Sequence, residues 1–130
     1  MRVVFDSDIL VSGLIFPGKQ AEKALLRIIE GRDRLLVSKP IIDELLNVLA
    51  RKFARDREAL ARTAVLITDL GEMARPKRRI RVFRDEPDNR ILECAVCGHA
   101  AAIVTRDHEI LDLHSFEGVA IVSLRDYLKS

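Results

Sequence analysis

The sequence predicts an α/β fold, with three α/β/α layers around a small parallel central sheet. Three observations support this. Short apolar and β-branched runs recur along the chain, segments with helical spacing of apolar residues separate them, and turn residues mark the boundaries. Strands that alternate with helices form parallel sheets with right-handed crossovers, so helices are expected on both faces. The length of 130 residues and the 48% hydrophobic content suit one domain over residues 1–130.

The first half of the chain is expected to hold two strands and three helices. Residues 2–6 form a buried strand that ends at Asp6, and 35–37 form a second strand. Apolar spacing over 20–30 predicts a helix that closes at a glycine. Ser38 is a suitable N-cap for the next helix, which has Pro40 in its first turn, and a further helix spans about 56–70.

The second half alternates strands and helices in the same way. Residues 80–83, 100–104 and 119–122 are expected as strands. A helix with a proline near its start runs from about 85–88 to 97. Ser123 caps a short final helix.

Charge and cysteine content indicate where the protein acts. Net charge is only +2, but 75–84 hold six basic residues and no acid. These residues, including Lys77, Arg78, Arg79 and Arg81, either contact RNA phosphates or protect the edge of a sheet from pairing. Two cysteines, no signal peptide and no apolar membrane span lead us to expect a cytoplasmic protein without a membrane partner.

Four acids are expected at one edge of the sheet. Asp6 ends the first strand, Asp107 follows the strand at 100–104, Asp88 follows the strand at 80–83, and Glu44 lies early in a helix. In open α/β sheets, sites form outside the carboxyl ends of the strands. Crowded carboxylates repel one another, and Mg²⁺ or Mn²⁺, which prefer oxygen ligands, would relieve the repulsion. Such a site activates water for an in-line phosphoryl displacement.

Capping is the competing interpretation of each acid. An Asp after a strand is also a good helix N-cap, so no single one of these residues indicates a site by itself. Helical periodicity does not choose between Asp43 and Glu44, and position along the chain does not choose between Asp85 and Asp88.

Four segments in order resemble the motifs of the PIN-domain family, in particular the VapC-like toxins of toxin–antitoxin modules. They are residues 3–12 (VVFDSDILVS), 42–49 (IDELLNVL), 85–95 (DEPDNRILECA) and 103–111 (IVTRDHEIL). This alignment selects Glu44 over Asp43 and Asp88 over Asp85.

The resemblance implies a Mg²⁺- or Mn²⁺-dependent endoribonuclease. Its catalytic and metal-binding residues would be Asp6, Glu44, Asp88 and Asp107, with Thr105 hydrogen-bonded within the site. It also implies an RNA substrate, a cognate antitoxin and a homodimer. The alternatives are a PIN nuclease of RNA processing or decay outside a toxin module, and an inactive acidic binding module.

Three positions depart from the family pattern. Asp8 stands where Asn is usual, which adds a carboxylate beside Asp6. Asn89 stands where a further Asp is frequent, and Arg106 stands where a small residue is common. Asp8 and Asn89 are therefore expected as supporting residues of the site.

Overall fold

The computed structural model describes all residues from 1 to 130, and its centre is a six-stranded sheet in the order β3-β2-β1-β4-β6-β5. The parallel strands are β1 (Arg2–Phe5), β2 (Arg34–Val37), β3 (Gly71–Met73), β4 (Ala102–Thr105) and β6 (Val119–Ser123). The two-residue strand β5 (Ser115–Phe116) pairs antiparallel with β6. The sheet is thus almost wholly parallel, as predicted.

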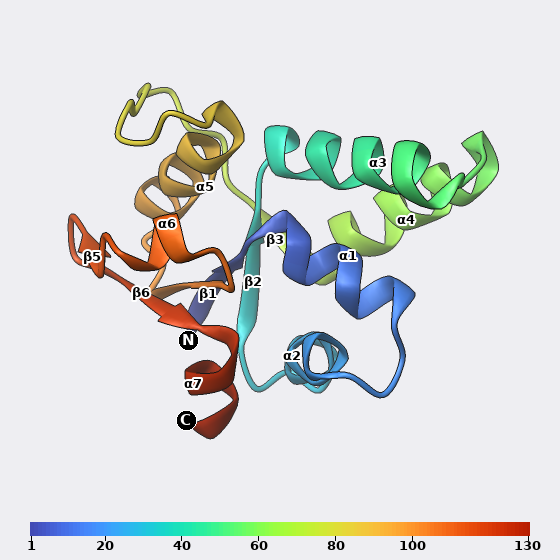
Figure 1. Cartoon of the computed structure of the whole chain (residues 1–130), viewed down its shortest axis with the longest axis horizontal. Helices are drawn as coiled ribbons and strands as arrows, with labels where there is room; N and C mark the ends of the chain where they lie inside the picture. The colour runs from blue at the N-terminus through green and yellow to red at the C-terminus, as the bar shows by residue number, and fades with distance from the viewer.

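Helices cover both faces of this sheet (Figure 1). They are α1 (Ser7–Ile15), α2 (Gln20–Ile29), α3 (Lys39–Phe53), α4 (Arg57–Leu70), α5 (Glu86–Cys97), α6 (His108–Leu111) and α7 (Leu124–Lys129). Figure 1 shows α5 and α6 on one side and α1 to α4 on the other, while α7 packs against α2, β4 and β6. The predicted α/β/α layering is confirmed.

The core explains why the central strands are continuous apolar runs. Strand β1 has Val3, Val4 and Phe5 buried, and every residue of β4 is buried. A parallel sheet with helices on both faces leaves its middle strands no solvent side, so alternation of polar and apolar residues is lost. No helix of the structure is long and apolar enough to cross a membrane.

The prediction of a strand over residues 80–83 is wrong. Residues 74–85 form a loop, and the strand on the outer side of β2 is β3, which is only three residues long. The backbone N–H groups of Val82 and Phe83 donate to the Asn89 side chain, and that of Ile80 donates to Glu93. Side chains of α5 therefore replace the neighbouring strand as hydrogen-bond partners.

Candidate active site

Two acidic segments meet because β1 and β4 pair in parallel register. Phe5 lies opposite Val104, and the Asp6 amide donates to the Val104 carbonyl at 3.0 Å. The Thr105 hydroxyl donates to Asp6 Oδ2 at 2.9 Å and accepts from the Asp107 amide at 3.0 Å. Thr105 is fully buried and Asp6 is 7% exposed, so this contact is fixed within the sheet edge.

Both acids also cap helices, as the competing interpretation required. Asp6 Oδ1 accepts weakly from the Asp8 amide at 3.5 Å at the start of α1. Asp107 Oδ1 accepts from Glu109 at 2.8 Å and from Ile110 at 3.4 Å at the start of α6. Capping uses one oxygen of each carboxylate, so it fixes their orientation without neutralising their charge.

Asp88 comes to the same edge from the first turn of α5. Burial, followed by the charges of Asp85, Asp6, Asp107 and Glu109, raises the pKa of Asp88 to about 7. Asp88 is therefore electrostatically coupled to both acids of the strand ends.

The pKa of Asp6 is raised as well. Burial is the largest cause, hydrogen bonds from Thr105 and the Asp8 amide oppose it, and the charges of Asp8 and Asp107 add to it. The fold thus gathers Asp6, Asp88 and Asp107 into a cluster with uncompensated negative charge.

Glu44 lies apart from these three acids. It is half-buried on α3 and lines a separate hollow of about 290 Å³ together with Ser7, Asp8 and Ser12. Its charge is not among the main causes of the raised pKa of Asp6 or Asp88. The neighbouring Asp43 is exposed and pairs with Lys39 at 2.8 Å, so of the two acids it is Glu44 that faces the α1 side.

Asp8 forms an ion pair with Arg106. The guanidinium reaches Asp8 Oδ2 through Nε at 3.1 Å and through Nη2 at 2.8 Å, and Nη2 also donates to Ser12 Oγ at 2.6 Å. Asp8 and Arg106, two of the positions that depart from the family pattern, thus form an ion pair that joins α1 to the segment between β4 and α6. Arg106 offsets part of the charge of Asp8, which still adds to burial in raising the pKa of Asp6.

The carboxylate oxygens of these acids are suitable ligands for a hard divalent cation. In this structure, however, the carboxylates do not surround a common point where a cation would bind. No group of three or more Asp, Glu, His or Cys side chains lies close enough to hold a metal ion. Carboxylate oxygens are the ligands that Mg²⁺ and Mn²⁺ prefer, and the raised pKa values of Asp6 and Asp88 mark charge that a cation would offset.

Asn89 is occupied by the loop rather than directed at the acids. Its side chain is fully buried, accepts from Val82 and Phe83, and donates to the Phe83 carbonyl at 2.8 Å. The structure therefore gives Asn89 a loop-holding role instead of the supporting role expected in the site.

The basic segment divides into two groups. Lys77, Arg78 and Arg79 line a pocket beside α5, whereas Arg81 does not. The pocket also includes Ser38 and Arg90, which sequence reasoning did not connect with function. The sequence indicates Ser38 only as an N-cap, and the position of Arg90 in the sequence does not relate it to the basic segment.

Comparison with known proteins adds a family and a fold. A family model described as PIN domain matches residues 2–109. The structure of VapBC-1 from nontypeable Haemophilus influenzae has a TM-score of 0.68 at 16% identity, covering 96% of this chain and 99% of that chain. VapBC2 from Rickettsia felis, bound to a DNA fragment from their promoter, has a TM-score of 0.64 at 11% identity, covering 95% and 98%. Curated proteins give no match.

Asp88 makes the stability of the metal-free protein depend on pH. Its pKa is about 7 when folded and near 3.8 when unfolded, so the folded state holds the extra proton between these values. Its stabilising contribution is present below about pH 4 and is lost as pH rises towards 7. Asp88→Asn should therefore raise the melting temperature by a few degrees at pH 8 in EDTA, with less gain at pH 5, since Asp88 is half-exposed and screened.

Thermal unfolding at pH steps from 5 to 8 measures this effect. Asp69→Asn, an exposed acid of α4, is the matched control and should not alter the pH dependence. Parallel curves for wild type and Asp88→Asn would contradict the raised pKa of Asp88.

Asn89→Ala should destabilise the fold by about 2 kcal/mol, because it leaves two part-buried backbone donors and one acceptor of the loop without their buried partner. Chemical denaturation measures the change. Asn47→Ala, at an exposed position of α3, serves as the control. Equal losses for the two variants would show that Asn89 does not hold the loop.

Proposed function

The chain belongs to the PIN-domain family, and from that premise we propose that it is a metal-dependent endoribonuclease. The observation that carries the proposal is the cluster of Asp6, Asp88 and Asp107 at the carboxyl edge of the sheet, whose negative charge no basic side chain compensates. An uncompensated acid cluster at this edge of an α/β sheet suits a site for cations and phosphoryl transfer.

Each acid has a distinct structural origin in the proposed site. Asp6 and Asp107 are held by the Thr105 hydroxyl at the ends of β1 and β4. Asp88 approaches from α5, and Glu44 from α3 is the fourth acid of the proposal. Thr105 is a positioning residue, since it fixes one oxygen of Asp6 and orients the segment that carries Asp107.

Bare carboxylates would repel the phosphates of RNA, so substrate binding itself requires charge compensation. The residues that would hold Mg²⁺ or Mn²⁺ are Asp6, Asp88 and Asp107, with Glu44 as the fourth. When bound there, the cation supplies neutralising charge and an activated water. Burial of Asp6 and Thr105 keeps solvent from competing for the fixed hydrogen bond between them.

A toxin role in a toxin–antitoxin module is the more specific part of the proposal. The similar solved structures are of VapBC complexes, and the match extends over nearly their whole chains. We therefore propose a cognate antitoxin that covers the acidic edge, and a homodimer as in the toxins that the sequence resembles. Action on RNA within the cytoplasm follows from the same proposal.

Removing Asp6 should abolish cleavage. Asp6→Asn keeps the size and an acceptor for Thr105 but removes charge, so RNA cleavage with Mg²⁺ or Mn²⁺ should fall at least about 100-fold, and EDTA should abolish it in wild type. Thr105→Val should lower the rate of RNA cleavage about 10- to 100-fold, which is the usual effect of removing a residue that hydrogen-bonds to a metal ligand. Single-turnover cleavage of a mixed-sequence RNA is the measurement.

Asp43→Asn is the control, because this exposed acid of α3 pairs with Lys39 outside the cluster. It should retain wild-type cleavage. Equal rates for Asp6→Asn and wild type would refute the catalytic assignment.

Toxicity separates the toxin proposal from RNA processing or decay. Expression of the wild-type chain in a bacterial host should slow growth, and Asp6→Asn should relieve this effect because it removes the cluster's central carboxylate. Growth curves of matched strains with equal protein levels are the measurement. Active RNA cleavage without growth inhibition would count against the toxin role while leaving the nuclease proposal intact.

A further inference from the structure

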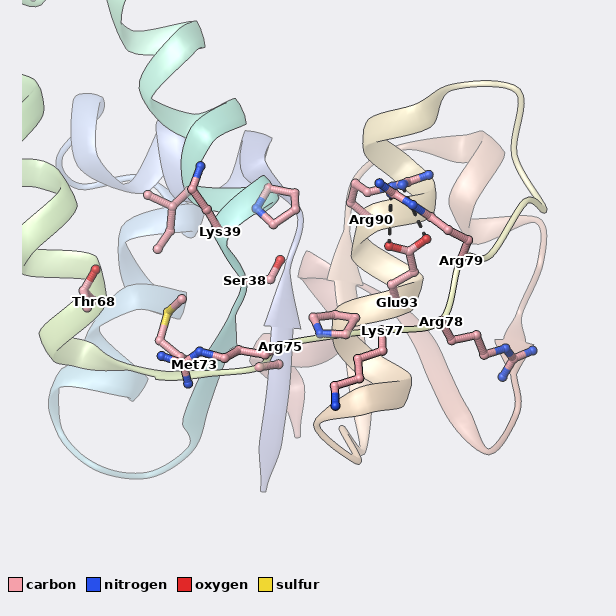
Figure 2. Close-up of a pocket in the computed structure, with 14 residues that line it drawn as sticks. Ser38, Lys39, Thr68, Met73, Arg75, Lys77, Arg78, Arg79, Arg90 and Glu93 are labelled. Atoms are coloured by element: carbon pink, nitrogen blue, oxygen red, sulfur yellow. Dashed lines mark ion pairs between the residues drawn. The ribbon is translucent and has the colours of Figure 1, made fainter.

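A second, basic pocket lies outside the acid cluster. It has a volume of about 720 Å³ and lies between the start of α3, the end of β3, the 74–80 loop and α5 (Figure 2). Its lining includes one acid, Glu93, and six basic side chains, which are Lys39, Arg75, Lys77, Arg78, Arg79 and Arg90. The pocket has the size of a small-molecule site and the opposite charge to the cluster.

The positive charge of this pocket is only partly compensated. Lys39 pairs with Asp43, Arg78 with Glu117 and Arg90 with Glu86, and all three acids lie outside the lining. Arg75 and Lys77 have no carboxylate within ion-pair distance. The lining therefore keeps an excess of positive charge that an anion would balance.

Glu93 orders one wall of the pocket. It is 6% exposed, accepts from the Ile80 amide at 2.9 Å, and lies 3.5 Å from Arg90 and 3.7 Å from Arg79. Figure 2 shows both guanidinium groups gathered above this carboxylate. One buried acid thus fixes the loop and two cationic groups at once. This lowers the entropic cost of ordering these side chains when a ligand binds.

Two buried polar atoms of the lining residues have no hydrogen-bond partner, Ser38 Oγ and Arg90 Nε. Ser38 is 1% exposed, and Figure 2 shows its side chain directed into the space between α3 and α5. Burial raises the pKa of the Cys94 thiol and the neighbouring Ser38 opposes this rise, but no hydrogen bond of acceptable geometry joins the two side chains. Native proteins rarely leave such atoms unsatisfied without a ligand or ordered water.

Ser38 is also the N-cap of α3, a helix of 15 residues. Its hydroxyl makes no capping bond, so the first turn keeps unsatisfied N–H groups beside the pocket. The partial positive charge of a helix N-terminus favours anions, as do the guanidinium groups of the opposite wall.

We propose that this pocket binds a phosphate group, carried either by a nucleotide or by an RNA strand. Arg75 and Lys77 supply charge that no acid compensates, and Arg79 and Arg90, which Glu93 holds in place, supply further guanidinium donors. The start of α3 with Ser38 supplies neutral donors at the buried end. The proposal that phosphate binds in this pocket does not depend on the function of the acid cluster. Only the identification of the phosphate as part of an RNA substrate rests on the proposed nuclease function.

Calorimetric titration in EDTA at pH 7.5 tests the proposal without metal or cleavage. The probes are inorganic phosphate, AMP, adenosine, and a short oligoribonucleotide without terminal phosphates. AMP should bind and adenosine should not. Tighter binding of AMP than of the oligoribonucleotide identifies a nucleotide or strand-end site, and the reverse order identifies a site for backbone phosphates.

Variants connect the binding to this pocket. Arg75→Gln/Lys77→Gln should weaken binding of the phosphate probe about tenfold or more, since hydrogen bonds to charged groups are lost. Ser38→Ala should also weaken it, while leaving the ligand-free protein as stable as wild type or more so, because it removes an unsatisfied buried hydroxyl.

Arg32→Gln/Arg34→Gln is the matched control, since it removes the same charge from exposed positions at the start of β2, outside this pocket. It should bind the probes as wild type does. Equal weakening by the two double variants, or no binding of any phosphate probe to wild type, would overturn the proposal. Loss of cleavage in Asp6→Asn with phosphate binding retained would show that the two sites are separate.

Discussion

The Thr105 hydroxyl joins two strand ends that would otherwise repel each other. It donates to Asp6 and accepts from the Asp107 amide, and the parallel pairing of β1 with β4 makes both contacts possible. Because the strands are buried on both faces, Asp6 cannot move into solvent without disturbing the core, whereas Asp107 lies at the exposed rim of the same edge. The fold thus holds negative charge at a fixed place and leaves its neutralisation to something outside the chain.

Helix α5 connects this acidic edge with the basic pocket. Its first turn carries Asp88, its next residue Asn89 holds the loop, and Glu93 one turn later orders the two arginines of the pocket. Residues two apart on a helix point to different sides, so Asp88 and Arg90 serve different surfaces. Any shift of α5 would therefore disturb the acid cluster, the loop and the pocket together.

The sequence predicted the layers and most elements because these depend on local patterns. Strand ends also placed Asp6 and Asp107 at one edge of the sheet, whereas Asp88 was selected over Asp85 only by the resemblance to the family, and the role of these acids stays a prediction. Apolar runs and capping residues gave the strands at β1, β2, β4 and β6, and Ser123 caps α7 as expected. The error over 80–83 has a physical cause, since an apolar run does not reveal that Asn89 and Glu93 will take its hydrogen bonds. Strand β3 has only three residues, too few to show a recognisable pattern of apolar residues. That the Ser38 hydroxyl has no hydrogen-bond partner follows from the packing of α3 against α5, which the sequence does not reveal.

The ion pair of Asp8 and Arg106 shows how two unusual residues explain each other. Alone, Asp8 would add a further charge beside Asp6, and Arg106 would place a cation beside Asp107. In the structure they pair with each other, and the Arg106 guanidinium also donates to the Ser12 hydroxyl on the α1 side. Both side chains are substantially exposed, so the pair contributes at most about 1 kcal/mol to folding. Its consequence is electrostatic: Arg106 is paired with Asp8, whose charge still adds to burial in raising the pKa of Asp6, whereas no ion pair compensates Asp6, Asp88 or Asp107.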